Sequence, residues 1–208
     1  MMFNWAPVVI YLTPMKEVSP KSNWQIAVTA TDTVWGLIAK PNQANTERIY
    51  QIKGRDKNKP LIIFVKSISK LKELSEGWDP LIEAIAREHF PGALTIVMKR
   101  SSKLDSFINP EITTIGMRIP DSKQVLDLIN DDEFLLSTSA NLSGQEPVTN
   151  YQEAQAQFSN QVDLILDIEQ ASSGEASTII SYIDGKIEIL RQGKLSQSLI
   201  GNSLHSAS

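Results

Sequence analysis

The sequence predicts an α/β fold in one domain, and three observations support this prediction. Short apolar runs of strand length alternate along the chain with stretches of helical spacing. Of the 208 residues, 41% are hydrophobic and 21% are charged, which is ordinary for a globular domain. No internal repeat, low-complexity tract or linker divides the chain. We therefore expect one domain over residues 24–195, between an N-terminal lead-in over residues 1–23 and a polar C-terminal tail over residues 196–208.

The composition argues against several classes of function. A net charge of −4 disfavours a non-specific nucleic-acid binder. The absence of cysteine excludes disulfides and thiolate metal sites, and two histidines are too few for a His-rich zinc site. No apolar run approaches the roughly 20 residues of a membrane span, and the apolar start lacks the preceding basic residues of a signal peptide. We expect a cytoplasmic protein without a membrane partner.

Strands are expected where apolar runs are bounded by polar turns. These runs lie at Ile26–Val28, Leu61–Val65, Leu94–Met98, Thr113–Ile119, Phe134–Leu136, Leu164–Asp167, Ile179–Ile183 and Ile187–Leu190. Asp184-Gly185, between the last two runs, is a strong signal for a two-residue hairpin. In the fourth run, Thr114, Gly116 and Arg118 share one face of the strand, and apolar residues share the other. We expect the Arg118 side chain to point from that face into an open cavity, where it would prefer an anionic partner.

Helices are expected between these runs. They cover a stretch that ends at Ile52 and is capped by Asn42 or Asn45, and the ranges Asp79–His89, Asp121–Ile129 and Tyr151–Phe158. Asp79-Pro80 is a particularly clear start, because it combines an N-cap side chain with a first-turn proline.

Three segments that adjoin strands are rich in hydroxyl groups. They are Thr29–Leu37, Ser137–Gly144 and Ala171–Thr178. Ser137–Gly144 follows a predicted strand and offers three serines, a threonine and an amide. Such segments present hydroxyl and backbone N–H groups to an anion or a polar ligand without a fixed charge. A polar turn explains any one of them, but their repetition indicates a shared pocket.

The stretch Lys53–Pro60 carries four cations within seven residues and predicts a mobile basic loop. Considered alone, it is more simply a solvated charged turn, in which alanine at Lys53 or Arg55 costs little fold stability. Combined with the hydroxyl-rich segments and the strand-borne Arg118 and Arg191, it describes a site for a polyanion and a small polar partner. The sequence contains no Ser–His–Asp set, HExxH motif, Walker motif or Rossmann glycine pattern.

Six motifs occur in order along the chain, at Thr31–Leu37, Lys53–Arg55, Phe90–Thr95, Gly116–Pro120, Ser139–Gly144 and Ser177–Ile179. Their content and order resemble the YrdC-like threonylcarbamoyl-AMP synthase family. The pairing of a Lys-x-Arg motif with a distant Ser-x-Asn motif, together with the Thr-Asp-Thr-Val and late Ser-Thr-Ile segments, makes the resemblance specific. It covers residues 24–193 and matches the short, single-domain form of the family.

The resemblance implies a twisted, open mixed sheet that is flanked by helices around a concave basic cavity. It also implies L-threonylcarbamoyladenylate synthase activity, a nucleotidyltransferase reaction in which L-threonine, bicarbonate and ATP give threonylcarbamoyl-AMP and pyrophosphate. The product supplies the threonylcarbamoyl group of a tRNA adenosine beside the anticodon. The proteins that transfer this group, and the tRNA itself, are therefore expected partners.

The resemblance also assigns site residues. The ATP side comprises Lys53, Arg55, Lys59, Thr114, Ser139, Asn141 and Arg191, and the threonine side comprises Thr33, Arg118, Ser137 and Ser177. Mg²⁺ is expected with the ATP phosphates rather than in a protein metal site. No covalent nucleophile is expected, because positioning and charge neutralisation suffice for this chemistry.

The sequence departs from the family's pattern at four positions. Ala30 stands where the family has proline, Trp35 where it has tyrosine, Lys59 where it often has asparagine, and Phe64 where longer members have histidine. We expect Trp35 to keep an aromatic wall of the site and Phe64 to remove a polar contact to the amino acid. Two alternatives stay open at this point: a paralogue with altered amino-acid specificity, and a non-catalytic module that binds tRNA or structured RNA.

Overall fold

The structure is a computed structural model that describes residues 23–56, 59–104, 107–108, 112–129, 133–166 and 172–197. The predicted lead-in up to residue 22, the predicted tail from residue 198, Lys57 of the basic loop and Asp167 of a predicted strand lie outside these ranges. The strands are β1 Ile26–Thr29, β2 Gly36–Ala39, β3 Ile62–Phe64, β4 Ser75–Glu76, β5 Leu94–Arg100, β6 Thr114–Arg118, β7 Leu135–Ser139, β8 Leu164–Leu166, β9 Thr178–Ile183 and β10 Lys186–Arg191. The helices are α1 Gln43–Lys53, α2 Ile68–Leu74, α3 Pro80–His89, α4 Lys123–Leu128 and α5 Tyr151–Phe158.

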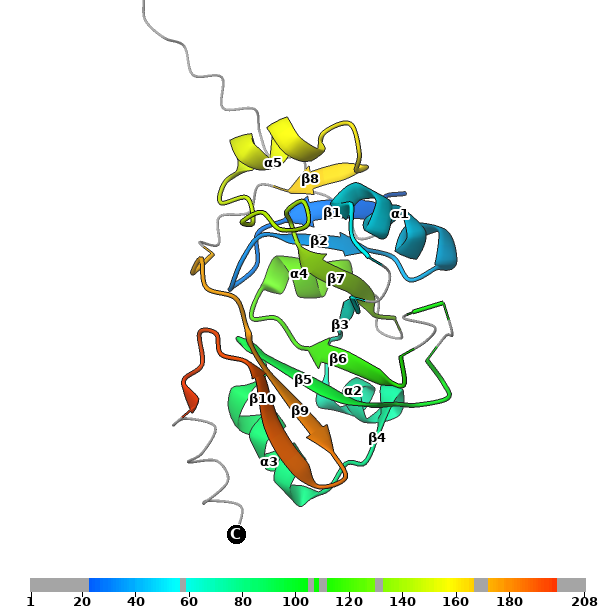
Figure 1. Cartoon of the computed structure of the whole chain (residues 1–208), viewed down its shortest axis with the longest axis vertical. Helices are drawn as coiled ribbons and strands as arrows, with labels where there is room; N and C mark the ends of the chain where they lie inside the picture. Colours follow the sequence, from blue (N-terminus) through cyan, green and yellow to red (C-terminus); the bar gives the residue numbers. More distant parts are fainter. Residues whose placement is uncertain are drawn as a thin grey trace, which may run out of the picture.

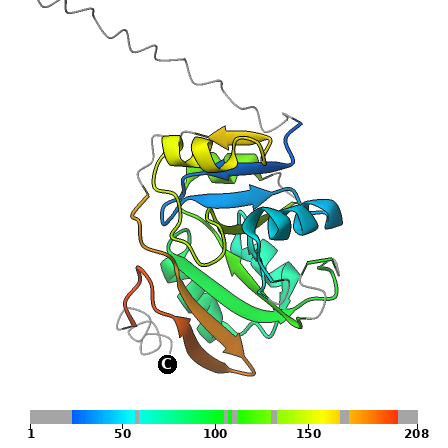
Figure 2. The same ribbon diagram turned by 45° about the horizontal axis from the view of Figure 1, so that its top comes forward.

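All ten strands of the described ranges belong to one sheet, with the order β10-β9-β5-β6-β3-β7-β2-β1-β8 and with β4 paired to β5. The pairs β5–β9, β3–β6 and β1–β8 are parallel, and the remaining pairs are antiparallel. The sheet is twisted and open, with the β9–β10 hairpin at one end and β8, next to α5, at the other (Figure 1 and Figure 2). The predicted mixed sheet with flanking helices is confirmed.

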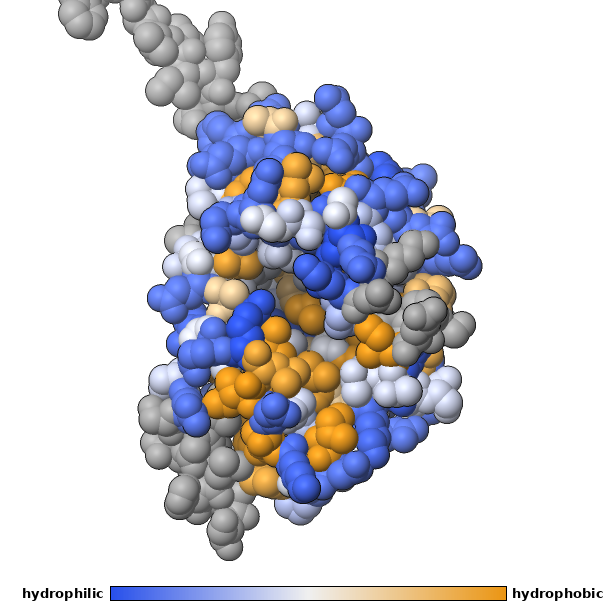
Figure 3. Space-filling view, viewed as in Figure 1, coloured by the Kyte–Doolittle hydropathy of each residue, from blue (hydrophilic) through white to orange (hydrophobic). Residues whose placement is uncertain are grey.

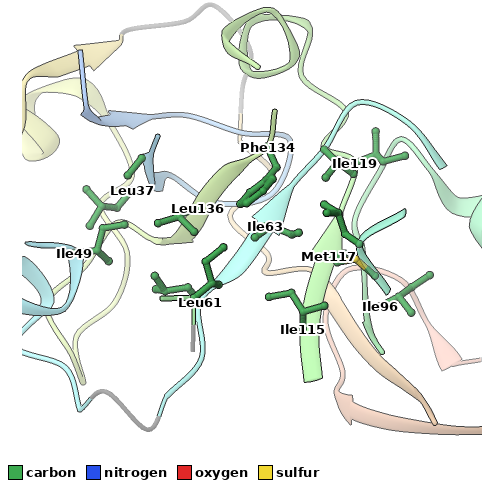
Figure 4. Packing of buried hydrophobic residues seen from close by; sticks show 14 of the residues in the cluster. Leu37, Ile49, Leu61, Ile63, Ile96, Ile115, Met117, Ile119, Phe134 and Leu136 are labelled. Atoms are coloured by element: carbon green, nitrogen blue, oxygen red, sulfur yellow. The ribbon is translucent and has the colours of Figure 1, made fainter. Parts of the chain in front are cut away.

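Buried apolar side chains form two clusters on opposite faces of the sheet. Ile63 and Leu136 belong to the larger cluster, together with side chains of α1, α2, α3 and α5 (Figure 4). Phe64 and Leu135, their neighbours in the chain, belong to the smaller cluster, which includes α4. Because successive strand residues point to opposite faces, α4 covers the second face. Ser137, two positions after Leu135, extends that second face beyond α4.

Local signals placed most of the predicted elements correctly. Asn42 rather than Asn45 caps α1, because its side chain accepts a hydrogen bond from the backbone of Asn45. Asp79 caps α3, and the β9–β10 hairpin turns at Asp184 and Gly185, which both have positive φ. The sequence did not predict β2, α2 or β4, which have only 4, 7 and 2 residues. The longest described helix is α1 with 11 residues, and none of the described helices could cross a membrane.

The predicted end of the strand Phe134–Leu136 was wrong, since the corresponding strand β7 continues to Ser139. Ser137 pairs with Ile38 of β2 on one side and with Ile62 of β3 on the other. Pairing with two neighbouring strands, rather than side-chain polarity, therefore keeps these residues extended. As a result, Ser137 is 2% exposed and presents its hydroxyl from a rigid strand.

We predict that Asn42→Ala lowers the free energy of unfolding by about 1 kcal/mol, because the first turn of α1 loses its side-chain acceptor. Gln51→Ala, at an exposed position of the same helix, should change it by less than about 0.5 kcal/mol. Urea denaturation of both variants measures the difference. Equal losses would show that the cap does not determine the stability of α1.

Candidate ligand-binding cavity

An open cavity of about 410 Å³ lies over the second face of the sheet, at Ser137, Gly116 and Phe64. Its walls come from β3, β5, β6, β7, β9 and β10 and from the segments around Thr33 and Ala176. Figure 3 shows the molecule hollowed near its middle, with hydrophilic residues above the hollow and hydrophobic residues inside and below it. The volume is within the range of small-molecule sites in proteins.

Nine of the eleven predicted site residues line this cavity. They are Thr33, Arg55, Thr114, Arg118, Ser137, Ser139, Asn141, Ser177 and Arg191. The structure therefore brings the three hydroxyl-rich segments together, although they are far apart in the chain. Lys53 and Lys59 do not line it: Lys53 is buried against Ser139 and Asn141, and Lys59 is exposed.

Arg118 lies at the base of the cavity and is 3% exposed. Its Nε donates to the carbonyl of Gly92 at 2.9 Å, and one terminal nitrogen donates to Thr33 Oγ1 at 2.8 Å. The other terminal nitrogen donates to Asp32 Oδ1 at 2.6 Å, which forms a buried ion pair. The ring of Phe64 lies 5.7 Å from the guanidinium carbon, so it packs against the cation. Arg118 lies on the predicted face of its strand, but the anionic group that it binds in this structure is Asp32 of the protein itself.

Sequence reasoning missed the role of Asp32, which is 8% exposed. The residue lies inside a quoted motif, but its partner Arg118 is 86 positions away, so no local pattern links them. The threonines on either side of Asp32 form a compact turn, in which Thr31 Oγ1 contacts Thr33 Oγ1 at 3.1 Å and donates to the carbonyl of Val34 at 2.7 Å. An acid between two threonines at the end of a strand was the available signal.

Ser177 is held by two elements, β5 and β10. Its hydroxyl lies 2.8 Å from Thr95 Oγ1 of β5, and Arg191 donates to its carbonyl at 2.8 Å and to its hydroxyl at 3.2 Å. Gly193 allows this approach, because a Cβ there would lie 2.3 Å from the carbonyl oxygen of Ala176. The end of β10 therefore fixes the Ser177 wall of the cavity.

Arg55 follows α1 and reaches the cavity from the side of β7. One terminal nitrogen donates to Thr138 Oγ1 at 2.9 Å, and the other donates to the carbonyl of Pro60 at 3.3 Å. Its Nε is buried without a hydrogen-bond partner among the described residues. Burial lowers the pKa of the Arg55 guanidinium. Each terminal nitrogen carries a second N–H group beyond these contacts, so the side chain keeps hydrogen-bonding capacity.

The prediction that Lys53 belongs to a mobile, solvated loop was wrong. Lys53 is the last residue of α1 and is 2% exposed. Its Nζ donates to the carbonyls of Ser139 at 2.5 Å and Asn141 at 2.9 Å, and to Asn141 Oδ1 at 2.9 Å. Burial, together with the smaller effect of the nearby charge of Arg55, lowers the pKa of Lys53 to about 8. The expectation that alanine at Lys53 is harmless to stability does not fit this environment.

The structure gives Trp35 and Phe64, two of the four departures from the family's pattern, roles that the sequence did not predict. Trp35 is 5% exposed and belongs to the larger core cluster, so it does not form the expected wall of the cavity. Phe64 does line the cavity, where it packs against Arg118.

Gly116 lies beside Ile62, whose Cγ2 would lie 2.9 Å from an added Cβ. Close packing between β3 and β6, as well as space for a ligand, therefore requires glycine here.

The ionisable residues that line the cavity within the described ranges are Arg55, Arg118 and Arg191. Asp32 balances Arg118, whereas Arg55 and Arg191 have no carboxylate partner among the described residues. Chemically, the cavity lining combines hydroxyl groups with the uncompensated positive charge of Arg55 and Arg191. This arrangement suits a ligand that carries several negative charges.

Comparisons with known proteins find relatives over most of the chain. The family model named Sua5/YciO/YrdC, described as telomere recombination, matches residues 23–193. A protein of Methanocaldococcus jannaschii is 33% identical over 172 residues, which cover 82% of this chain and 81% of that protein. Human threonylcarbamoyl-AMP synthase is 32% identical over 177 residues, covering 81% of this chain and 62% of the human protein. The solved structure of Pyrococcus abyssi Sua5 with L-threonine superposes with a TM-score of 0.81 at 28% identity and covers 86% of this chain and 54% of that one. The chain thus spans most of one relative and about half to two thirds of the other two.

We predict that Lys53→Ala lowers the free energy of unfolding by about 1–3 kcal/mol, because three buried acceptors lose their donor. Arg55→Ala should cost less than about 1 kcal/mol, since its partners lie nearer to solvent. Chemical denaturation of the two variants at pH 7 makes the comparison. A larger loss for Arg55→Ala than for Lys53→Ala would contradict the buried role of the lysine.

Proposed function

The chain belongs to the Sua5/YciO/YrdC family, and we propose that it is an L-threonylcarbamoyladenylate synthase. This nucleotidyltransferase would form threonylcarbamoyl-AMP and pyrophosphate from L-threonine, bicarbonate and ATP. The observation that carries the proposal is the cavity, in which hydroxyl-rich segments converge with Arg55, Arg118 and Arg191. The similarity to relatives named threonylcarbamoyl-AMP synthase, and to a Sua5 structure with L-threonine, supports the choice of substrates.

The threonine side of the proposed site lies at Arg118. Thr33, Ser137 and Ser177 surround it on the cavity wall. Each Arg118 terminal nitrogen carries two N–H groups, and the described partners use one on each. The remaining N–H groups would bind the carboxylate of threonine, and the neighbouring hydroxyls would orient its amine and side chain. Asp32 and Gly92 hold the guanidinium in place for this contact.

The ATP side lies between Arg55 and Arg191. Arg55 has a buried Nε without a partner among the described residues, and Arg191 extends from β10 at the rim. These charges would offset the charge of the phosphates, while Thr114 and Ser139 would orient the nucleotide with hydroxyl groups. Lys59 is exposed on the segment before β3, and we propose that it approaches the phosphates only when ATP is bound.

The reaction needs no nucleophile from the protein. Bicarbonate and the threonine amine give a carbamate and water, and a carbamate oxygen then attacks the α-phosphorus and displaces pyrophosphate. The cavity would hold the two reactants in contact and stabilise the charge that develops on the phosphate. Mg²⁺ would enter as part of the ATP substrate. The described lining offers hydroxyl oxygens but no carboxylate, so phosphate oxygens would be its main ligands.

The product is a mixed anhydride, which water hydrolyses, so a further protein must bind it before hydrolysis. We propose that tRNA-modification proteins transfer the threonylcarbamoyl group to tRNA in the cytoplasm, and that the tRNA is brought by those proteins or by a contact with this chain.

We predict that the protein releases pyrophosphate from ATP only when both L-threonine and bicarbonate are present. A coupled pyrophosphate assay, with the acyl-adenylate identified by mass spectrometry, measures the requirement. Arg55→Ala should lower the rate at limiting ATP by roughly tenfold or more, since a charge-assisted contact to phosphate contributes about 1.5–3 kcal/mol. Arg87→Ala on α3 is the matched control, because Arg87 pairs with Glu83 at the surface, and its rate should not change.

Other outcomes assign other functions. Release with a different amino acid in place of threonine would identify the paralogue with altered specificity. Release without any amino acid would indicate a plain ATPase. No release, together with RNA binding that weakens steeply with salt, would support the RNA-binding module.

A further inference from the structure

We propose that Lys53 and Asn141 are positioning residues, which form a latch between α1 and the cavity wall and do not themselves contact the nucleotide. The latch comprises the Lys53 ammonium group, the Asn141 side-chain amide and their partners on Ser139–Gln145. This proposal divides the Lys-x-Arg and Ser-x-Asn motifs by role: Arg55 and Ser139 face the ligand, and Lys53 and Asn141 shape the wall. The identity of the nucleotide rests on the proposed function, but the latch itself does not.

The ammonium group of Lys53 has no free donor for a ligand. A lysine ammonium donates at most three hydrogen bonds, and three acceptors lie within 2.5–2.9 Å of Nζ. All three acceptors belong to Ser139 and Asn141, 86 and 88 positions away in the chain. The side chain is 2% exposed and does not line the cavity. A phosphate could replace these partners only by breaking the structure that holds the wall.

The amide of Asn141 is also fully used. Its Oδ1 accepts from Lys53 Nζ at 2.9 Å and from Ser139 Oγ at 2.6 Å. Its Nδ2 donates to the carbonyls of Leu142 at 3.0 Å and Gln145 at 2.6 Å. An asparagine side chain has two acceptor sites and two donors, so all four have partners. Asn141 borders the cavity, but its polar atoms are directed into the wall.

A backbone contact strengthens the same connection. The amide of Ser143 donates to the carbonyl of Lys53 at 2.8 Å. Lys53 thus contacts the loop after β7 through both its side chain and its main chain. Because Lys53 ends α1, the position of the whole helix is coupled to the shape of this loop.

Arg55 shows the opposite arrangement, although it is only two residues from Lys53. Gly54 ends α1 with a φ of 55°, a left-handed conformation that suits glycine, and the chain changes direction there. Arg55 then lines the cavity with a buried Nε that has no partner among the described residues. Alternate residues of one motif therefore have different tasks.

Hydrogen exchange of the ligand-free protein tests the latch without reference to any substrate. In Lys53→Met, a chain of similar length without donors, the Ser143 amide should exchange roughly tenfold faster or more, which corresponds to about 1.4 kcal/mol of local opening. In Arg55→Ala, the matched control, exchange of this amide should not change. Asn141→Ala removes the other half of the latch and provides the same readout should Lys53→Met fail to fold. Unchanged exchange at Ser143 in Lys53→Met or Asn141→Ala would overturn the proposal.

A double-mutant cycle on ATP affinity, measured by calorimetry, separates positioning from direct contact. If the two residues act through each other, Lys53→Met and Asn141→Ala each lower the affinity for ATP. The double variant should then bind ATP no more weakly than the single variant with the lower affinity. Additive losses would mean that each residue contacts the nucleotide independently, and they would overturn the latch. Faster exchange combined with an inactive wild-type protein would leave the latch intact and refute only the proposed reaction.

Discussion

The buried ion pair between Arg118 and Asp32 is the interaction on which the cavity depends most. A guanidinium group inside a sheet is costly unless its charge is balanced and its N–H groups have acceptors. Asp32 balances the charge, and Gly92 and Thr33 accept further hydrogen bonds. Because these partners lie on the β1–β2 connection and on the segment after α3, one side chain ties both to β6. The base of the cavity is thereby fixed before any ligand arrives.

Charge is distributed unevenly around this base. Arg118 is neutralised by Asp32, whereas Arg55 and Arg191 have no carboxylate partner in the described part of the chain. A zwitterionic amino acid suits the neutralised end, where directed N–H and hydroxyl groups matter more than net charge. A polyanion suits Arg55 and Arg191, where its phosphates would supply the missing counter-charges. The balanced and unbalanced arginines therefore explain how one cavity could accommodate two different substrates.

The sequence predicted which residues lie at the cavity better than it predicted the role of each one. Periodicity and capping residues located most elements, and nine of the residues assigned through the family resemblance line one cavity. Lys53 was assigned to a solvated loop because its acceptors lie more than 80 positions away and leave no local signal. Asp32 was missed for the same reason, and Trp35 was assigned to the cavity although its side chain turns into the core. Such roles follow from which strands become neighbours, and β2, which pairs with β1 and β7, was not predicted.

The affinity for L-threonine in Arg118→Lys, measured by calorimetry beside the affinity for ATP, tests the central claim most directly. Lysine keeps the positive charge but loses the planar fork that would bind a carboxylate. The account predicts that threonine affinity falls roughly tenfold or more, about 1.4 kcal/mol, while ATP affinity changes by less than about twofold. Denaturation of the same variant shows whether it remains folded at the temperature of the titration. Equal losses for threonine and ATP in the folded variant, or unchanged threonine affinity, would contradict the assignment of the Arg118 end to the amino acid.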